Sequence, residues 1–127
     1  MPWQISIITD YPVVETLFSG FLTEEELKPA MEETLAIAKN HAINLFLEDC
    51  TQMDGVQSVA VLFFLSGSLK LKSVIFHSKK AVLIRNICFT LEQIRFWEAK
   101  CLERDIEIRL FSDRQLALDW LLSGTFH

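Results

Sequence analysis

Cysteine is scarce in this sequence of 127 residues, and the three that occur, Cys50, Cys88 and Cys101, form no Cys-x-x-Cys pair. An odd number of cysteines without that spacing argues against a disulfide framework and against a thiolate metal site. The thiols therefore fit a reducing compartment, in which cysteine serves as a small apolar residue. The first residues include no basic segment ahead of their apolar ones. We therefore expect a cytoplasmic protein without a secretory signal.

Long hydrophobic runs are also absent. The most apolar segment, residues 59–65, is far shorter than the roughly 20 residues that a membrane span needs, so no span is expected. The sequence contains no GxGxxG, P-loop, HExxH or G-x-S-x-G motif. These absences argue against the common nucleotide and hydrolase chemistries, and they predict a protein that is not an enzyme and has no cofactor.

Acidic residues are missing from residues 55–91, which carry five bases, whereas residues 1–54 carry ten acids and two bases. The formal net charge of −5 has the wrong sign for a nucleic-acid-binding protein. Two interpretations of the basic segment remain open. Its charges either flank buried apolar segments, or they meet an anionic surface or an acidic partner such as residues 1–54 of a second copy.

The hydrophobic pattern that is present predicts one α/β domain, with a mixed sheet of four to five strands that begins with a hairpin and continues in β-α repeats. The predicted strands are Trp3–Thr9, Val13–Ser19, Ile43–Leu47, Lys79–Arg85 and Glu107–Phe111. The turn Asp10-Tyr11-Pro12 joins the first two strands, which are expected to be antiparallel. A chain of this length fits a single domain spanning residues 1–127.

Helices are predicted after most of these strands, and three of them begin with a capping box. The capping pairs are Thr23 with Glu26, Thr90 with Gln93, and Ser112 with Gln115. Pro29 should either kink the first helix or mark where its regular part begins. His41 is expected to cap the far end of that helix and not to act as a ligand.

The segment after the strand Ile43–Leu47 is the first candidate site, because ligands in α/β sheets gather where parallel strands end. We expect Glu48, Asp49 and Asp54 to cluster there in a loop. They would act either as solvated acids and helix caps, or as a site for a cation or a partner.

Two further residues of this segment could carry chemistry. A nucleophilic Cys50 would need a base or a cation nearby, but its acidic neighbours should raise the thiol pKa. Ser58 is either a phosphorylation site near a helix start or a small polar residue of a helix. The segment Asp49, Cys50, Asp54 and Ser58 is therefore a candidate binding or regulatory loop and not a catalytic centre.

The segment Val56–Leu69, interpreted as a short helix, is apolar nearly all round, so part of it must face something other than solvent. Its candidate contact residues are Val59, Leu62, Phe63 and Phe64. They would form an interface with a protein partner or a second copy, or they would cover a cavity for a small apolar ligand.

This order of elements resembles the SpoIIAA-like fold of the STAS superfamily, in particular its small stand-alone STAS/SEC14-like bacterial proteins. The matching features are Gly20 after the hairpin, a Thr-capped acidic helix with Pro29, the strand KKAVLI, and the ending EIRLFSDRQLALDWL. The resemblance covers essentially the whole chain. It implies a four- or five-stranded mixed sheet with helices packed against it.

The resemblance also implies a role. In STAS regulators, the loop before the second helix carries a serine that a partner kinase phosphorylates, usually in an Asp-Ser pair ahead of a glycine. Ser58 stands in roughly that place, but between Gln57 and Val59. The SEC14 relationship implies lipid-like ligands. The sequence thus predicts a non-enzymatic regulatory interaction module or homodimer, with a carrier of a small apolar ligand as the alternative.

Overall fold

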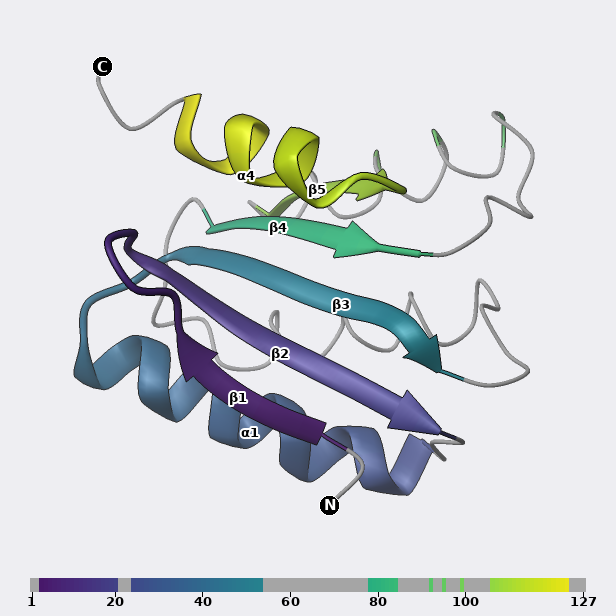
Figure 1. Ribbon diagram of the computed structural model, residues 1–127. Helices are drawn as coiled ribbons and strands as arrows, with labels where there is room; N and C mark the ends of the chain where they lie inside the picture. Colours follow the sequence, from purple (N-terminus) through teal and green to yellow (C-terminus); the bar gives the residue numbers. More distant parts are fainter. Residues whose placement is uncertain are drawn as a thin grey trace.

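The computed structural model describes residues 3–20, 24–53, 78–84 and 106–123, together with the helical positions Glu92, Arg95 and Ala99. These residues contain the strands β1 (Trp3–Ile7), β2 (Val13–Gly20), β3 (Leu45–Met53), β4 (Ser78–Leu83) and β5 (Ile106–Phe111). They also contain the helices α1 (Glu24–Asn40) and α4 (Arg114–Ser123) (Figure 1).

The strands form one sheet in the order β1-β2-β3-β4-β5, which is also their order in the chain. β1 pairs antiparallel with β2, and all the other neighbours are parallel. The mixed α/β sheet with an opening hairpin is therefore confirmed. In the hairpin turn Asp10 has a φ of 76°, a region that aspartate tolerates better than most residues. The backbone N–H of Ile8 closes the hairpin by donating to the carbonyl of Val13 at 3.0 Å.

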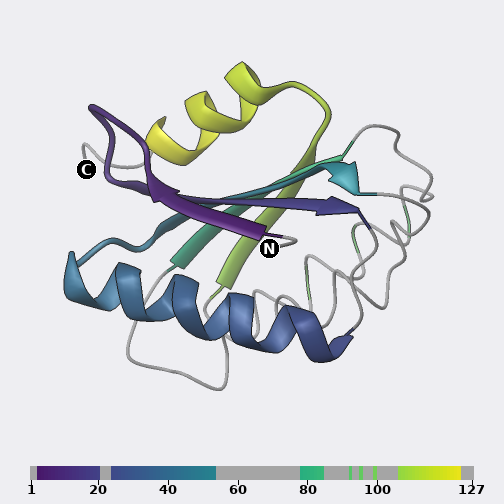
Figure 2. The same ribbon diagram turned by 60° about the horizontal axis from the view of Figure 1, so that its bottom comes forward.

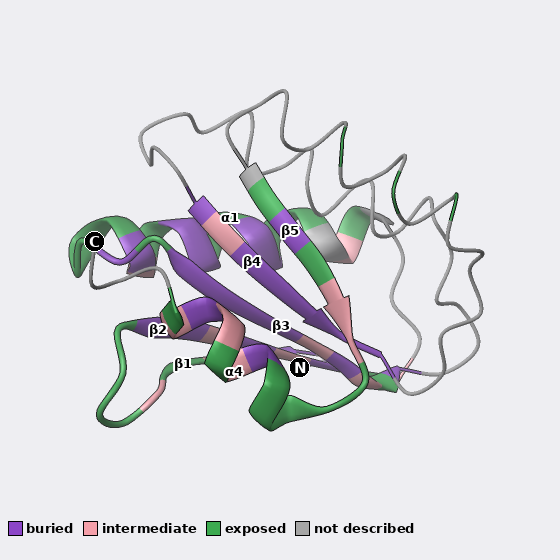
Figure 3. Cartoon of the chain, turned by 90° about the horizontal axis from the view of Figure 1, so that it is seen from above, coloured by how far each residue is buried: buried purple, intermediate pink, exposed green. Residues whose placement is uncertain are grey.

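α1 and α4 lie on opposite faces of the sheet, so the core has two layers (Figure 2). The α1-side layer includes Trp3, Val14, Phe18, Met31, Leu35, Phe46, Val82, Ile84 and Ile108. The α4-side layer includes Val13, Leu45, Leu47, Ala81, Leu83, Ala117 and Leu121. β3 and β4 contribute side chains to both layers and are buried over most of their length (Figure 3). This double burial explains why their sequences are nearly continuous apolar runs.

β3 is longer than the sequence indicated. The predicted strand ended at Leu47 and the acidic residues after it were interpreted as a loop, but the strand continues to Met53. The prediction was wrong because a run of acids normally signals exposure. Here one of the two acids, Glu48, is fully buried opposite a lysine from the next strand.

A β-bulge interrupts the pairing of β3 with β2, since β3 has one extra residue between the partners of Leu17 and Ser19. Successive residues of a strand alternate between faces, and an extra residue shifts that alternation by one. As a result, Cys50 and Met53 both point into the α1-side layer although they are three positions apart.

The start of α1 agrees with the prediction, whereas the cap of α4 differs from it. α1 begins at Glu24, so Pro29 lies inside the helix, and the expectation that it marks the start of the regular part was wrong. α4 begins at Arg114 and is capped by Asp113 and not by Ser112. Asp113 is the residue immediately before the helix, and its Oδ1 accepts the backbone N–H of Gln115 at 2.8 Å.

The C-terminus of α1 is closed by a Schellman motif. The N–H of Ile43 donates back to the carbonyl of Ala38 at 2.9 Å, and Ala42 takes a left-handed φ of 53°. His41 Nδ1 donates to the carbonyl of Ile37 at 3.0 Å, so its predicted role as a cap is confirmed.

The helix predicted over Val56–Leu69 lies outside the described residues. Most of the helix predicted after Thr90 does so too, but Glu92, Arg95 and Ala99 are helical, as that prediction requires. Among the described parts of the chain, no helix is long and apolar enough to cross a membrane.

Candidate functional site

Polar groups gather on both sides of β3. Because side chains alternate along a strand, Glu48 and Asp49 point to opposite faces of the sheet. The expected cluster of these two acids was therefore wrong. The other predicted site residues, Asp54, Ser58, Val59, Leu62, Phe63 and Phe64, lie outside the described residues.

On the α1 side, Glu48 forms a buried ion pair. Lys80 Nζ lies 3.2 Å from Glu48 Oε1, and neither side chain is more than 1% exposed. Met31 of α1 closes over the pair, with its sulfur 3.9 Å from Lys80 Nζ. The expectation that Lys79–Arg85 is a strand with charged ends was wrong at Lys80, whose charge lies in the core.

The pair is electrostatically costly. Burial raises the pKa of Glu48 above its ordinary value, and the nearby charge of Lys80 opposes this effect without cancelling it. Neither carboxylate oxygen of Glu48 accepts a well-oriented hydrogen bond. Buried ion pairs often recover less energy than the two ions lose by leaving water. This carboxylate is thus held in a place that disfavours its charged form.

A chain of hydroxyl groups links β2 to α1 beside the strand that carries Glu48. Thr16 lies directly opposite Glu48 in the pairing of β2 with β3. The hydroxyl of Thr34 donates to the carbonyl of Ala30 at 2.8 Å, so the 2.9 Å contact between Thr16 and Thr34 uses the Thr16 proton. The Thr16 hydroxyl therefore helps to hold α1 on β2.

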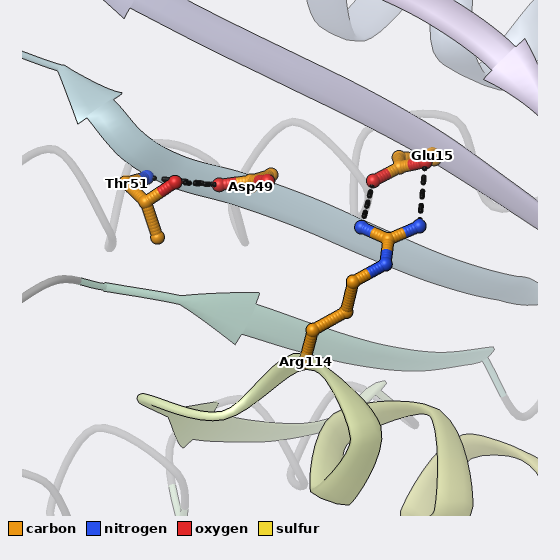
Figure 4. A network of polar contacts seen from close by, with 4 residues as sticks. All are labelled: Glu15, Asp49, Thr51 and Arg114. Carbon is orange, nitrogen blue, oxygen red and sulfur yellow. Dashed lines mark hydrogen bonds and ion pairs between the residues drawn. The ribbon is translucent and has the colours of Figure 1, made fainter.

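On the α4 side, two polar contacts lie near each other on the sheet (Figure 4). Arg114 binds Glu15 through both ends of its guanidinium, with Nη2 at 3.0 Å from Oε1. Asp49 Oδ1 accepts hydrogen bonds from the backbone N–H and the hydroxyl of Thr51, at 2.9 and 2.6 Å. The hydrogen bond with Glu15 and the charges of Glu15 and Asp49 raise the pKa of Arg114. The contact ties the start of α4 to β2.

Cys50 is free and buried on the α1 side of the sheet. Burial raises the pKa of its thiol, and the carboxylates of Glu48 and Asp49 raise it further, as the sequence predicted. Lys80 acts in the opposite direction but does not compensate. The sulfur is therefore a protonated thiol, which is a poor nucleophile and a poor metal ligand.

Trp120 of α4 is the centre of a second cationic contact that the sequence did not reveal. Lys79 Nζ donates to the Trp120 carbonyl at 2.9 Å and lies 4.6 Å from the centre of its ring. Arg109 lies 5.4 Å from the same ring, and Phe111 packs against it at 5.7 Å. These contacts depend on how β4, β5 and α4 are placed relative to one another, and no local motif signals that placement.

Within the described ranges, no group of three or more His, Cys, Asp or Glu side chains is arranged to hold a metal ion. The polar groups around β3 instead contact one another across elements. Their arrangement holds the two helices on the sheet.

Comparison with known proteins identifies the fold. No protein-family model and no curated protein matches the chain. A solved structure of an uncharacterised protein of the DUF3478 family from Shewanella loihica PV-4, with a SpoIIAA-like fold, is similar at a TM-score of 0.58 and 25% sequence identity. The similarity covers 94% of this chain and 91% of that chain. The resemblance inferred from the order of elements is thus confirmed: this chain has a SpoIIAA-like fold of the STAS type.

Proposed function

We propose that this chain is a non-enzymatic, cytoplasmic interaction module that works by binding a protein partner or a second copy of itself. One observation carries the proposal: every ionisable side chain of β3 is already engaged or shielded within the chain. Glu48 faces Lys80 in the core, Asp49 bonds to Thr51 of its own strand, and Cys50 is a buried thiol.

This arrangement is poorly suited to catalysis. A nucleophile or a general acid–base group must reach a substrate and must be paired with a second group that activates it. The thiol of Cys50 and the carboxylate of Glu48 are buried, at 2% and 0% exposure, so neither reaches solvent. Interaction modules have no such requirement, because they need only a rigid scaffold that presents a surface.

Native mass spectrometry of the full chain purified from its own host tests the proposal. We expect a noncovalent complex whose extra mass is that of a protein, either a second copy or another chain. A bound apolar molecule would contradict the proposal and favour the alternative, a carrier of lipid-like ligands. A monomer without ligand at every concentration would contradict both.

The same preparation tests the proposed regulatory role of Ser58. Peptide mapping of the peptide that contains Ser58 distinguishes the two interpretations of this residue, a phosphorylation site and a small polar residue of a helix, and Ser58→Ala should remove any phosphate found there. Phosphate on another residue would show that Ser58 is not the regulated site. Dissociation of the complex without any phosphate would show the same. The interaction proposal would then remain and the phosphorylation proposal would fall.

A further inference from the structure

The exposed side chains of β5 carry a regular charge pattern. β5 is the last strand of the described sheet and pairs with β4 along one side. Glu107 and Arg109 are both exposed, whereas Ile108 between them is buried at 2% exposure. Figure 3 shows this alternation along the strand. The acid and the base therefore share one face of an edge strand, on either side of a single apolar residue.

The two faces of β5 can be assigned from its contacts. Arg109 lies over the ring of Trp120 in α4, so Arg109 and Glu107 face the α4 side. Ile108 belongs to the α1-side layer, and Leu110 packs against that layer. One face of the edge is thus charged and the other apolar.

From this pattern we infer that β5 pairs with β5 of a second copy, antiparallel and centred on Ile108, so that two sheets join into one. Two identical strand edges form a closed pair when a two-fold axis relates them. About an axis at Ile108, Glu107 of each copy lies opposite Arg109 of the other. On the other face, Ile108 of each copy lies opposite Ile108 of the other, and this residue belongs to the α1-side layer. The charged face is thus complementary, and the apolar face brings two identical apolar residues together.

Charge selects this register over its neighbours. Paired residues must point to the same face, so the nearest alternative axes lie at Glu107 and at Arg109. An axis at Glu107 places the two copies of Glu107 opposite each other, and an axis at Arg109 places the two copies of Arg109 opposite each other. Like charges directly opposite in a sheet are unfavourable, whereas opposite charges are favourable. Of these three registers, only the one centred on Ile108 avoids a like-charge pair.

The side chain of Arg109 is partly ordered before the two copies associate. Its contact with the Trp120 ring, at 5.4 Å, restricts the long side chain. A side chain that is already ordered loses less entropy on binding. The inference rests on the proposed function, of which it names the partner and the surface.

Charge reversal with compensation tests the register. The association constant of the purified full chain is measured by sedimentation equilibrium for the wild type and for Glu107→Arg and Arg109→Glu. Each single reversal replaces two favourable pairs by two unfavourable ones because of the two-fold axis. We expect a loss of about tenfold to a hundredfold in the association constant. Circular dichroism confirms that the variants are folded.

Two rescues make the test specific. The double variant Glu107→Arg/Arg109→Glu restores opposite charges across the axis and should dimerise again. An equimolar mixture of the two single variants should form a heterodimer, since one copy then has two bases at these positions and the other two acids. A simple loss of folding would be rescued by neither.

A wild-type chain that stays monomeric at every concentration would overturn the inference and would mean that the charges protect the edge from pairing. Dimers that are insensitive to both single reversals would overturn it by showing another interface. A monomeric pure chain that forms a complex with a different protein in the host would overturn the inference and leave the proposed function. A dimer that responds to the charge reversals but carries a bound apolar molecule would support the inference and contradict the proposed function.

Discussion

The carboxylate of Glu48 sits where burial disfavours its charge, although Lys80 lies beside it. Such a group links the stability of the protein to pH. Its folded-state pKa lies above its ordinary value of 4.5, so folding favours the protonated form. The stability that this preference contributes is fully present below pH 4.5, and it is lost as the pH rises through the folded-state pKa.

This reasoning predicts the behaviour of Glu48→Gln, which keeps the shape of the side chain but cannot ionise. Relative to wild type, the free energy of unfolding of the variant should increase as the pH rises from 4.5, by about 1.4 kcal/mol for each unit by which the pKa is raised. Urea unfolding at several pH values measures this difference. Glu32→Gln, at an exposed site on α1, is the control. A decrease with pH would show that Lys80 outweighs burial.

A second prediction concerns the thiol of Cys50. Its raised pKa and its burial should both slow alkylation by iodoacetamide in the native protein. We expect native alkylation at pH 8 to be slower than in urea by on the order of 100-fold or more. Mass spectrometry of the peptide that contains Cys50 gives both rates, and equal rates would contradict the buried, protonated thiol.

Among the elements, the C-terminus of α1 contains an avoidable strain, because Ala42 adopts a left-handed φ of 53°. Glycine takes this conformation without a steric penalty, although it loses more entropy on folding. We expect Ala42→Gly to raise the free energy of unfolding by about 0.5–1 kcal/mol. Ala36→Gly, on the exposed face of the same helix, should lower it by a similar amount. Thermal unfolding of both variants measures the effect, and the same sign for both would contradict it.

The bounds of the strands show which parts of the fold could be predicted from the sequence. Strands β1, β2, β4 and β5 were predicted within about two residues, since each combines β-branched apolar residues with turn signals at its ends. The full length of β3 was not predictable locally, because the partner of Glu48 comes from another strand. For the same reason no local motif announced the contact of Glu15 with Arg114. The expected acidic cluster failed because strand alternation separates Glu48 from Asp49.

At the scale of the whole molecule, the two layers share β3 and β4. A cavity in either layer should therefore lower the free energy of unfolding of the whole sheet. We expect Leu35→Ala, in α1, and Leu121→Ala, in α4, each to lower the free energy of unfolding by about 2–5 kcal/mol. Unfolding followed by circular dichroism and by tryptophan fluorescence should give one coincident transition in both variants.

The control for this experiment lies on the same helix as Leu121. Leu116 is 58% exposed, so Leu116→Ala should change the free energy of unfolding by less than about 0.5 kcal/mol. Separate transitions for the two probes would show that the α1-side and α4-side layers unfold independently.

The coincidence of sheet order with chain order has a consequence for synthesis. Each of the described strands β2 to β5 pairs with a strand that left the ribosome before it, and none of these strands has to enter between two earlier ones. The sheet can therefore grow from one side during translation, as domains commonly begin to fold before synthesis ends. β5 is the last strand to be added. The edge proposed to meet a second copy is therefore absent from every shorter nascent chain, so neighbouring chains on one messenger RNA cannot pair through it until β5 has been made.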